Sequence, residues 1–279
     1  ATWPWVFALP VALAAVSFVL TVVVVPHSVE HVDTGFDIAG SLLSIVAVGG
    51  LVLAIHEGPE QGWTAPITIV AAAAGLLGAA AFIVVELRRE HPLLDVRIFA
   101  IRGLAAGSVN LFVVFAVMFS MFLVLVQYLQ AVLGYSALRA ATGLLPMAAV
   151  MMPLSTIAPT IAERIGFRRT LVTGMLAMAA GLGLFAVMAD PTGGYLSVLP
   201  GVLILGAGVG LAMSPSTAAI TSSLPEEKQG VASALNDTVR EMGGAVGIAL
   251  IGSVLNAAYR SNIEPDLAGL PGEIVEPVS

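Results

Sequence analysis

The sequence predicts an all-α, polytopic membrane protein with about eight membrane-spanning helices. Of its 279 residues, 58% are hydrophobic and only 10% are charged, whereas about 25% of residues are charged in an average soluble domain. The mean hydropathy is +0.99, and the ionisable residues gather in short patches between long uncharged stretches. A soluble protein must cover its surface with polar groups, so this composition indicates that lipid surrounds most of the chain.

Eight uncharged runs each provide one expected span, because a helix needs about 20 apolar residues to cross a hydrocarbon core about 30 Å thick. In chain order they cover residues 1–26, 38–55, 61–85, 103–138, 140–162, 170–189, 191–225 and 242–259. The fourth run is the longest, but its tail QAVLGYS is typical of a turn, so one helix is expected there. The runs are continuously apolar rather than alternating, which excludes membrane β-strands.

The basic residues predict the orientation of these spans. Eight of the eleven lie on alternate connections that must share one face, namely Arg88, Arg89, Arg97, Arg102, Arg164, Arg168, Arg169 and Lys228. The opposite connections carry only Arg139 and Arg260, and Arg240 lies in the eighth helix. Such an excess marks the cytoplasmic side. We therefore expect a multi-pass protein of the plasma (inner) membrane, surrounded by membrane lipid.

Several chemistries are excluded by the residue inventory. The chain has no cysteine, which removes disulfides, thiolate metal sites and covalent haem attachment. The only lysine, Lys228, follows no glycine-rich loop, so no nucleotide-phosphate site is expected. The four histidines lie in connections or at a helix end, which removes paired haem ligands within the bilayer. We expect no cofactor, no metal, no nucleic-acid partner and no enzymatic activity.

Two local features have structural interpretations. The segment GAGVGLA, with Gly206, Gly208 and Gly210, lies within a membrane helix and follows no strand, so we interpret its glycines as sites of close helix packing rather than dinucleotide binding. Asp37 is expected to cap the start of the second helix, and His56 to lie at its interfacial end.

The eighth helix contains the strongest functional signal, in GVASALNDTVREMGGAVGIALIGSVL. Asn236, Asp237, Arg240 and Glu241 precede its fully apolar stretch, and the three charged residues share one helical face. A charged group at the bilayer centre costs about 2.5 to 3.5 kcal/mol even on the lenient insertion scale. Two interpretations remain open: a role in proton coupling or gating, or a neutral Asp237–Arg240 pair at the cytoplasmic boundary.

The fourth run offers candidates for a substrate cavity. Asn110, Ser120 and Gln127 are polar residues among methionine and phenylalanine side chains. They could provide polar contacts for a ligand, but asparagine and glutamine also join helices, and methionine also fills gaps in packing. Both interpretations remain open at each position.

The connection TIAERIGFRRTLV resembles the cytoplasmic loop motif of the major facilitator superfamily, GxLADRxGRK. Glu163 stands where the motif has aspartate, and Arg164, Gly166 and Arg168 keep their type, while Pro159 and Phe167 replace its first glycine and its first arginine after the second glycine. Together with Arg169, these residues could lock neighbouring helices in one state or anchor the cytoplasmic face by charge.

Four further segments, in order, resemble the fourteen-helix drug/proton antiporter family within that superfamily. They are FDIAGSLLSIVAVGGLVLAIHEGPEQGW, HPLLDVRIFAIRG, QYLQAVLGYSALRAATGLLPMA and ASALNDTVREMGGAVGIALIGSV. The resemblance covers roughly helices six to thirteen. It implies that residues 1–25 are the last helix of an N-terminal bundle, that residues 26–90 are a two-helix insert, and that residues 91–279 are a C-terminal bundle of five helices lacking its final one.

By this resemblance, the chain is expected to belong to a secondary active transporter. It would export hydrophobic or cationic small molecules in exchange for protons, and it would require the missing N-terminal bundle for transport. The alternative is a non-transporting membrane module, either an inactive remnant or a partner-binding scaffold.

Overall fold

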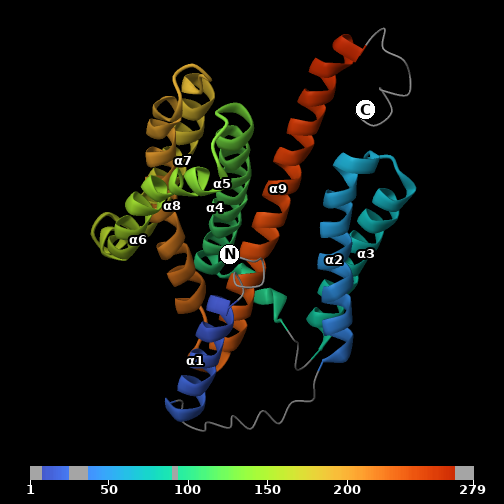
Figure 1. Ribbon diagram of the computed structural model, residues 1–279. Coiled ribbons are helices and arrows are strands. Elements are labelled where there is room, and N and C mark those ends of the chain that lie inside the picture. Colours follow the sequence, from blue (N-terminus) through green and yellow to red (C-terminus); the bar gives the residue numbers. More distant parts are fainter. Residues whose placement is uncertain (1–7, 25–36, 90–93, 268–279) are drawn as a thin grey trace. The chain divides into compact units, whose positions relative to one another are not determined.

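The computed structural model describes residues 8–24, 37–89 and 94–267, and every regular element among them is helical. In chain order these elements are α1 (Ala8–Val24), α2 (Ile38–Gln61), α3 (Pro66–Arg88), η2 (Val96–Ala100), α4 (Arg102–Gln127), η3 (Tyr128–Val132), α5 (Ala137–Thr142), α6 (Leu145–Ile165), α7 (Phe167–Met188), α8 (Tyr195–Ser222), η4 (Glu226–Lys228) and α9 (Gln229–Leu267) (Figure 1).

The chain divides into two compact units. The first, Ala1–Phe36, contains the single described helix α1, and the second, Asp37–Ser279, contains α2 to α9. The sequence of α1 is uniformly apolar, and its large side chains are exposed. Such exposure is expected of a helix whose surface is covered by lipid or by another helix.

Seven helices in the described part of the chain are long and apolar enough to cross a membrane. They cover Ile38–Pro59, Pro66–Arg88, Arg102–Val132, Ala137–Ile165, Phe167–Met188, Tyr195–Ser222 and Gln229–Tyr259. They confirm seven of the predicted spans and the all-helical fold class. The first predicted run corresponds to α1, whose apolar described part, Pro10–Val24, is shorter than the others.

One helix boundary differs from the sequence prediction. α2 continues through His56 and Pro59 to Gln61, so His56 lies inside the helix and not at its end. α9 begins at Gln229 and runs without interruption, so Asp237 and Arg240 lie inside a membrane-length helix, as expected from the sequence. The predicted turn after the fourth run is confirmed, because α4 ends in a single π-helical turn and the chain then bends at Gly134, where φ is +66°.

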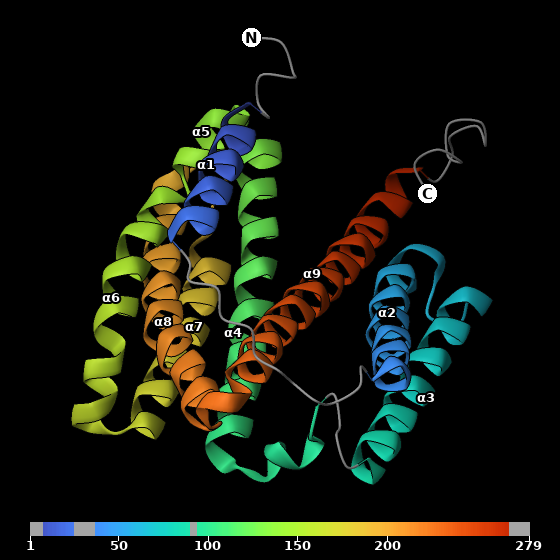
Figure 2. The same ribbon diagram turned by 90° about the horizontal axis from the view of Figure 1, so that it is seen from below.

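The core of the second unit forms around α8, which packs against α4, α6 and α7 (Figure 2). Its glycines allow this close packing on two faces. A Cβ atom on Gly208 would lie 2.6 Å from the Gly174 carbonyl oxygen of α7, and one on Gly210 would lie 2.6 Å from the Met151 carbonyl oxygen of α6. The packing interpretation of GAGVGLA is therefore confirmed.

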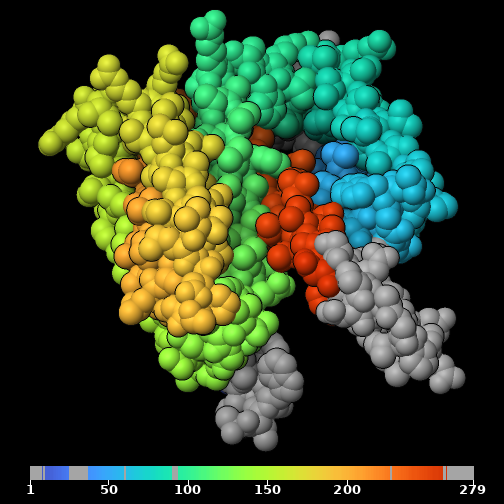
Figure 3. Space-filling model, turned by 90° about the horizontal axis from the view of Figure 1, so that it is seen from above, coloured from blue at the N-terminus to red at the C-terminus, as the bar shows by residue number. Residues whose placement is uncertain are grey.

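Helices α2 and α3 form an antiparallel hairpin in which Gly50 packs directly against the backbone of Gly75. α9 contacts both α2 and α4 and so joins this hairpin to the bundle of α4 to α8. The space-filling view shows α9 side chains between the two groups of helices (Figure 3). The links α3–α4, α6–α7 and α8–α9, which carry the eight basic residues, lie at one end of the helices (Figure 2).

Candidate functional site

Arg240 lies where α9 meets α4 and α8. Its Nη2 donates a hydrogen bond of 3.1 Å to Thr217 Oγ1 of α8, and its guanidinium carbon lies 5.1 Å from the ring centroid of Phe115 of α4. A guanidinium at this distance from an aromatic ring makes a favourable cation–π contact. The Nε atom is buried and has no hydrogen-bond partner. Three helices therefore meet around one partly buried cation.

The acidic residues predicted beside Arg240 are not brought to it. Asp237 and Glu241 are exposed on α9, and none of the ion pairs in the described part of the chain joins either carboxylate to Arg240. The neutral Asp237–Arg240 pair is thus not formed in this structure. Asn236 is 7% exposed, and its Oδ1 has no partner.

Asn110 adds a second polar link between the same helices. Its Nδ2 donates a 2.6 Å hydrogen bond to Ser216 Oγ, and that hydroxyl donates to the Ala212 carbonyl oxygen at 2.7 Å. Ser216 precedes Thr217, so consecutive residues of α8 hold Asn110 of α4 and Arg240 of α9. Buried polar groups in a membrane bundle are stabilised by such interhelical bonds. We call this set, Asn110, Ser216, Thr217, Asn236 and Arg240, the polar junction.

The polar junction keeps unused hydrogen-bonding capacity. Arg240 Nε is a donor and Asn236 Oδ1 is an acceptor, and both are buried without a partner. A cation without a carboxylate within 4 Å also favours the arrival of a negative charge. The junction therefore holds one donor and one acceptor that are available for a further hydrogen bond.

The other predicted cavity residues lie elsewhere. Ser120 is half-buried and Gln127 is exposed, and neither lines the apolar pocket found beside them. This pocket, which we call the methionine pocket, has a volume of about 370 Å³ and lies between α4 and the start of α6. Its walls are Met118, Phe119, Met121, Phe122, Leu125, Leu144, Met147, Ala148 and Met151.

The predicted loop motif forms the tight connection between α6 and α7. Gly166 ends one helix and precedes the next with φ at +94°, a conformation that favours glycine. Glu163 lines a groove of about 420 Å³ together with the end of α8 and the start of α4. The side chains of Arg164, Arg168 and Arg169 are exposed, and no described ion pair joins them to Glu163.

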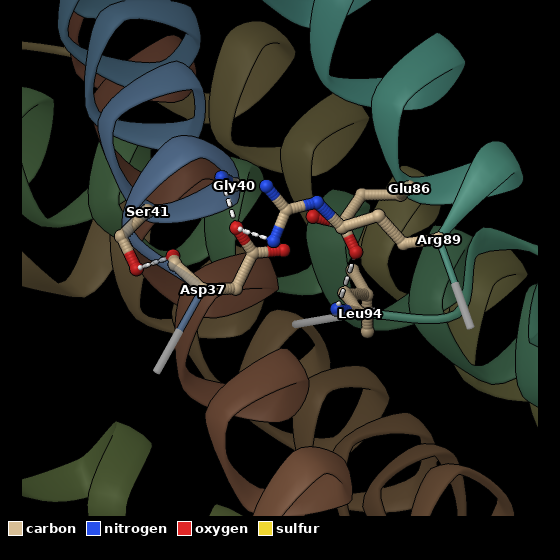
Figure 4. Close-up of polar contacts among 6 residues, drawn as sticks. All are labelled: Asp37, Gly40, Ser41, Glu86, Arg89 and Leu94. Carbon is tan, nitrogen blue, oxygen red and sulfur yellow. Dashed lines mark hydrogen bonds and ion pairs between the residues drawn. The ribbon is translucent and has the colours of Figure 1, made fainter. Parts of the chain in front are cut away.

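A buried charge cluster at one end of the hairpin was missed by the sequence interpretation (Figure 4). Asp37 caps α2 by accepting a 2.7 Å hydrogen bond from the Gly40 N–H, which confirms the predicted cap. The same Oδ1 lies 2.8 Å from Arg89 Nη1, and the buried Glu86 accepts a hydrogen bond from the Leu94 N–H. The signal available in the sequence was the antiparallel hairpin itself, which places the start of α2 beside the end of α3.

A cavity of about 860 Å³ lies between the hairpin and α9. Its walls are almost entirely apolar, with Phe82 and Phe99 on one side and Val231, Leu235 and Met242 of α9 on the other. Sequence periodicity could not have found it, because the lining comes from four elements separated along the chain.

Membrane-length helices, with basic residues at one end and a polar junction inside the bundle, define a multi-pass helical membrane protein. A model of the Major Facilitator Superfamily matches residues 1–248. The chain belongs to this family.

Several of its relatives are named for drug resistance or multidrug transport. The chain is 33% identical over 267 residues to the multidrug resistance protein Stp of Mycobacterium tuberculosis, covering 95% of this chain and 49% of that protein. It is 34% identical over 268 residues to the tetracenomycin C resistance and export protein of Streptomyces glaucescens, with the same coverage, and 30% identical over 278 residues to the multidrug transporter protein MdtP of Bacillus subtilis, covering 97% and 51%. The chain thus spans about half the length of these relatives.

Proposed function

We propose that this chain is part of a transporter that exports hydrophobic or cationic small molecules across the plasma (inner) membrane in exchange for protons. The observation that carries the proposal is the methionine pocket, in a family whose relatives carry drug-resistance names. Methionine side chains adapt their shape to different ligands, and aromatic faces accept both apolar surfaces and cations. Its volume lies within the range of about 300 to 1,000 Å³ typical of small-molecule sites.

The proposed cycle uses the charged residues of α9 that the sequence analysis singled out. Asp237 and Glu241 are exposed acidic residues inside a membrane-length helix; Asp237 lies about one turn before Arg240, and Glu241 directly follows it. In one state Asp237 would be a protonated carboxyl group. Rotation of α9 would let Arg240 exchange Thr217 for Asp237, and this carboxyl would then release its proton to water and become a carboxylate, because a neighbouring cation favours the charged form. Proton release would thereby be tied to helix movement.

A division of the full-length protein into two bundles completes the proposal. Residues 1–25 would close an N-terminal bundle, residues 26–90 would be the two-helix insert, and residues 91–279 would belong to the C-terminal bundle. Substrate would be passed between the two bundles, so export requires the N-terminal one. The α6–α7 connection, with Glu163 and the arginines that follow it, would hold the cytoplasmic ends together in one state.

The test is dye export from inverted membrane vesicles containing the full-length transporter that carries this sequence. We expect a fluorescent hydrophobic cation to accumulate inside the vesicles only while a proton gradient is imposed, and an uncoupler to abolish the accumulation. Met118→Ala combined with Met151→Ala should lower the apparent affinity for the dye, whereas Leu196→Ala, at an exposed position of α8, should not. Dye accumulation that does not depend on the proton gradient contradicts the proposal. Absence of dye accumulation contradicts it as well and favours a non-transporting module.

A further inference from the structure

The corner where α2 begins and α3 ends holds two buried carboxyl groups (Figure 4). Asp37 is 5% exposed and Glu86 is 0% exposed. Both belong to a hairpin of two membrane-length helices. Burial of a charged group away from water is costly unless hydrogen bonds and an opposite charge compensate for it. Any negative charge on these two carboxyl groups must therefore be compensated by groups at the corner itself.

Each carboxyl has one oxygen with partners and one without. Asp37 Oδ1 accepts from the Gly40 N–H and contacts Arg89, while Glu86 Oε2 accepts from the Leu94 N–H at 3.1 Å. Asp37 Oδ2 and Glu86 Oε1 are buried and have no hydrogen-bond partner. A buried acceptor without a donor is costly, and the cost is greater when the acceptor is charged.

The two unpartnered oxygens meet at Gly40. A Cβ atom built there would lie 2.8 Å from Asp37 Oδ2 and would collide with Glu86 Oε1. Both oxygens thus occupy the space that any other residue at position 40 would fill with its side chain. If both acids were ionised, two negatively charged acceptors would be held close together with no donor between them, which is unfavourable.

The described charges around the corner also favour one neutral acid. Arg89 contacts Asp37, and its side chain is 41% exposed. On the neighbouring elements, the Arg97 guanidinium donates to the Leu87 carbonyl oxygen at 2.8 Å, and Asp95 caps the Arg97 N–H. Neither is paired with Glu86. In the described part of the chain, the ion pair that reaches these acids joins Arg89 to Asp37.

We propose that Asp37 and Glu86 bind a single proton between them, which makes the α2–α3 hairpin a proton-binding site. Glu86 carries the hydrogen on Oε1 and donates it to Asp37 Oδ2, while Asp37 stays ionised against Arg89. One proton then provides a partner for both lone oxygens and brings the charge of the three groups to zero. Removal of the proton would set two carboxylates against each other and loosen the corner. This site is separate from Asp237 and does not depend on the proposed export function.

Infrared spectroscopy of the full chain in lipid bilayers tests the proposal, because a protonated carboxyl absorbs at a different frequency from a carboxylate. At neutral pH the wild-type chain should show one protonated-carboxyl band that Glu86→Gln lacks. The matched control Glu226→Gln, which removes an exposed acid, should keep the band. Asp37→Asn should also lose it, because the asparagine amide can donate to Glu86 Oε1 and Glu86 then ionises beside Arg89.

Thermal unfolding at increasing pH provides a second readout that does not rely on the band. The wild-type chain should lose stability in alkaline medium as the shared proton leaves. Glu86→Gln should lack this loss, because its amide N–H replaces the hydroxyl as donor to Asp37. Absence of a protonated-carboxyl band in the wild-type chain, or its persistence in Glu86→Gln, would overturn the proposal. An equal loss of thermal stability at alkaline pH in the wild-type chain and in Glu86→Gln would also overturn the proposal.

Discussion

At the scale of single residues, the sequence of α9 specifies which residues lie near one another along the helix, but not which contacts their side chains make in the polar junction. The spacing of Asp237, Arg240 and Glu241 places them on neighbouring positions of one helix. It does not say that the long Arg240 side chain extends to Thr217 and Phe115 while both acids stay exposed. That choice depends on the neighbouring helices, whose contacts are absent from the sequence of α9.

Asp237→Asn in the full-length transporter is predicted to abolish proton-driven efflux while leaving expression unchanged, because the amide cannot release a proton. Dye efflux from energised vesicles measures the effect. Asp190→Asn, in the turn between α7 and α8, is the matched control. The Thr192 N–H, and after it the Thr192 hydroxyl, hold the pKa of the Asp190 carboxyl below its ordinary value, so this group stays ionised near neutral pH. Undiminished efflux by Asp237→Asn removes Asp237 from the mechanism.

Asn110→Ala is predicted to destabilise the bundle, because it removes the interhelical hydrogen bond to Ser216. Interhelical bonds of this kind contribute on average about 0.6 kcal/mol in a membrane bundle, with a maximum near 1.7. Reversible unfolding in mixed micelles measures the change. Gln127→Ala, at an exposed position of the same helix, should change the free energy of unfolding by less than about 0.5 kcal/mol. Equal effects of the two substitutions would show that the Asn110 bond contributes nothing specific.

At the scale of helices, the sequence predicted which segments form membrane-length helices, but it did not predict where each helix ends. Bilayer thickness fixes the length of an apolar run, and seven of the predicted runs correspond to membrane-length helices. The end of α2 instead depends on local contacts: the chain passes Pro59 and stops only at Gly62, where φ is +99°, with the Trp63 ring packed against Gly58. Asp37 could be predicted as a cap from its position alone, but its pairing with Arg89 and its place beside Glu86 required the hairpin geometry.

Gly208→Leu is predicted to push α7 and α8 apart, because a Cβ at this position already meets the Gly174 carbonyl oxygen at 2.6 Å. Overpacking of this kind costs about 1 to 3 kcal/mol. The thermal unfolding midpoint in detergent should therefore fall. Gly183→Leu, in α7, faces open space and should leave the midpoint nearly unchanged. A drop of equal size in both variants would contradict the assigned packing role.

At the scale of the whole molecule, family membership and mechanism rest on different observations. The family follows from a match over residues 1–248. The proposed exchange of drug for proton combines the methionine pocket with the acids on α9 near the partly buried Arg240. The sequence could suggest this pocket only through scattered methionines. Pocket walls come from α4, α6 and the turn before α6, so their convergence is a property of the fold and not of any segment.

The most direct measurement of this exchange is proton movement driven by substrate alone. The full-length transporter is reconstituted into liposomes that enclose a pH-sensitive dye, and a hydrophobic cation is loaded on one side with no proton gradient imposed. Our account predicts that the cation, moving down its gradient, drives protons in the opposite direction, and that Asp237→Asn abolishes this proton flux. Substrate movement without any proton flux, or a proton flux unchanged in Asp237→Asn, would contradict it.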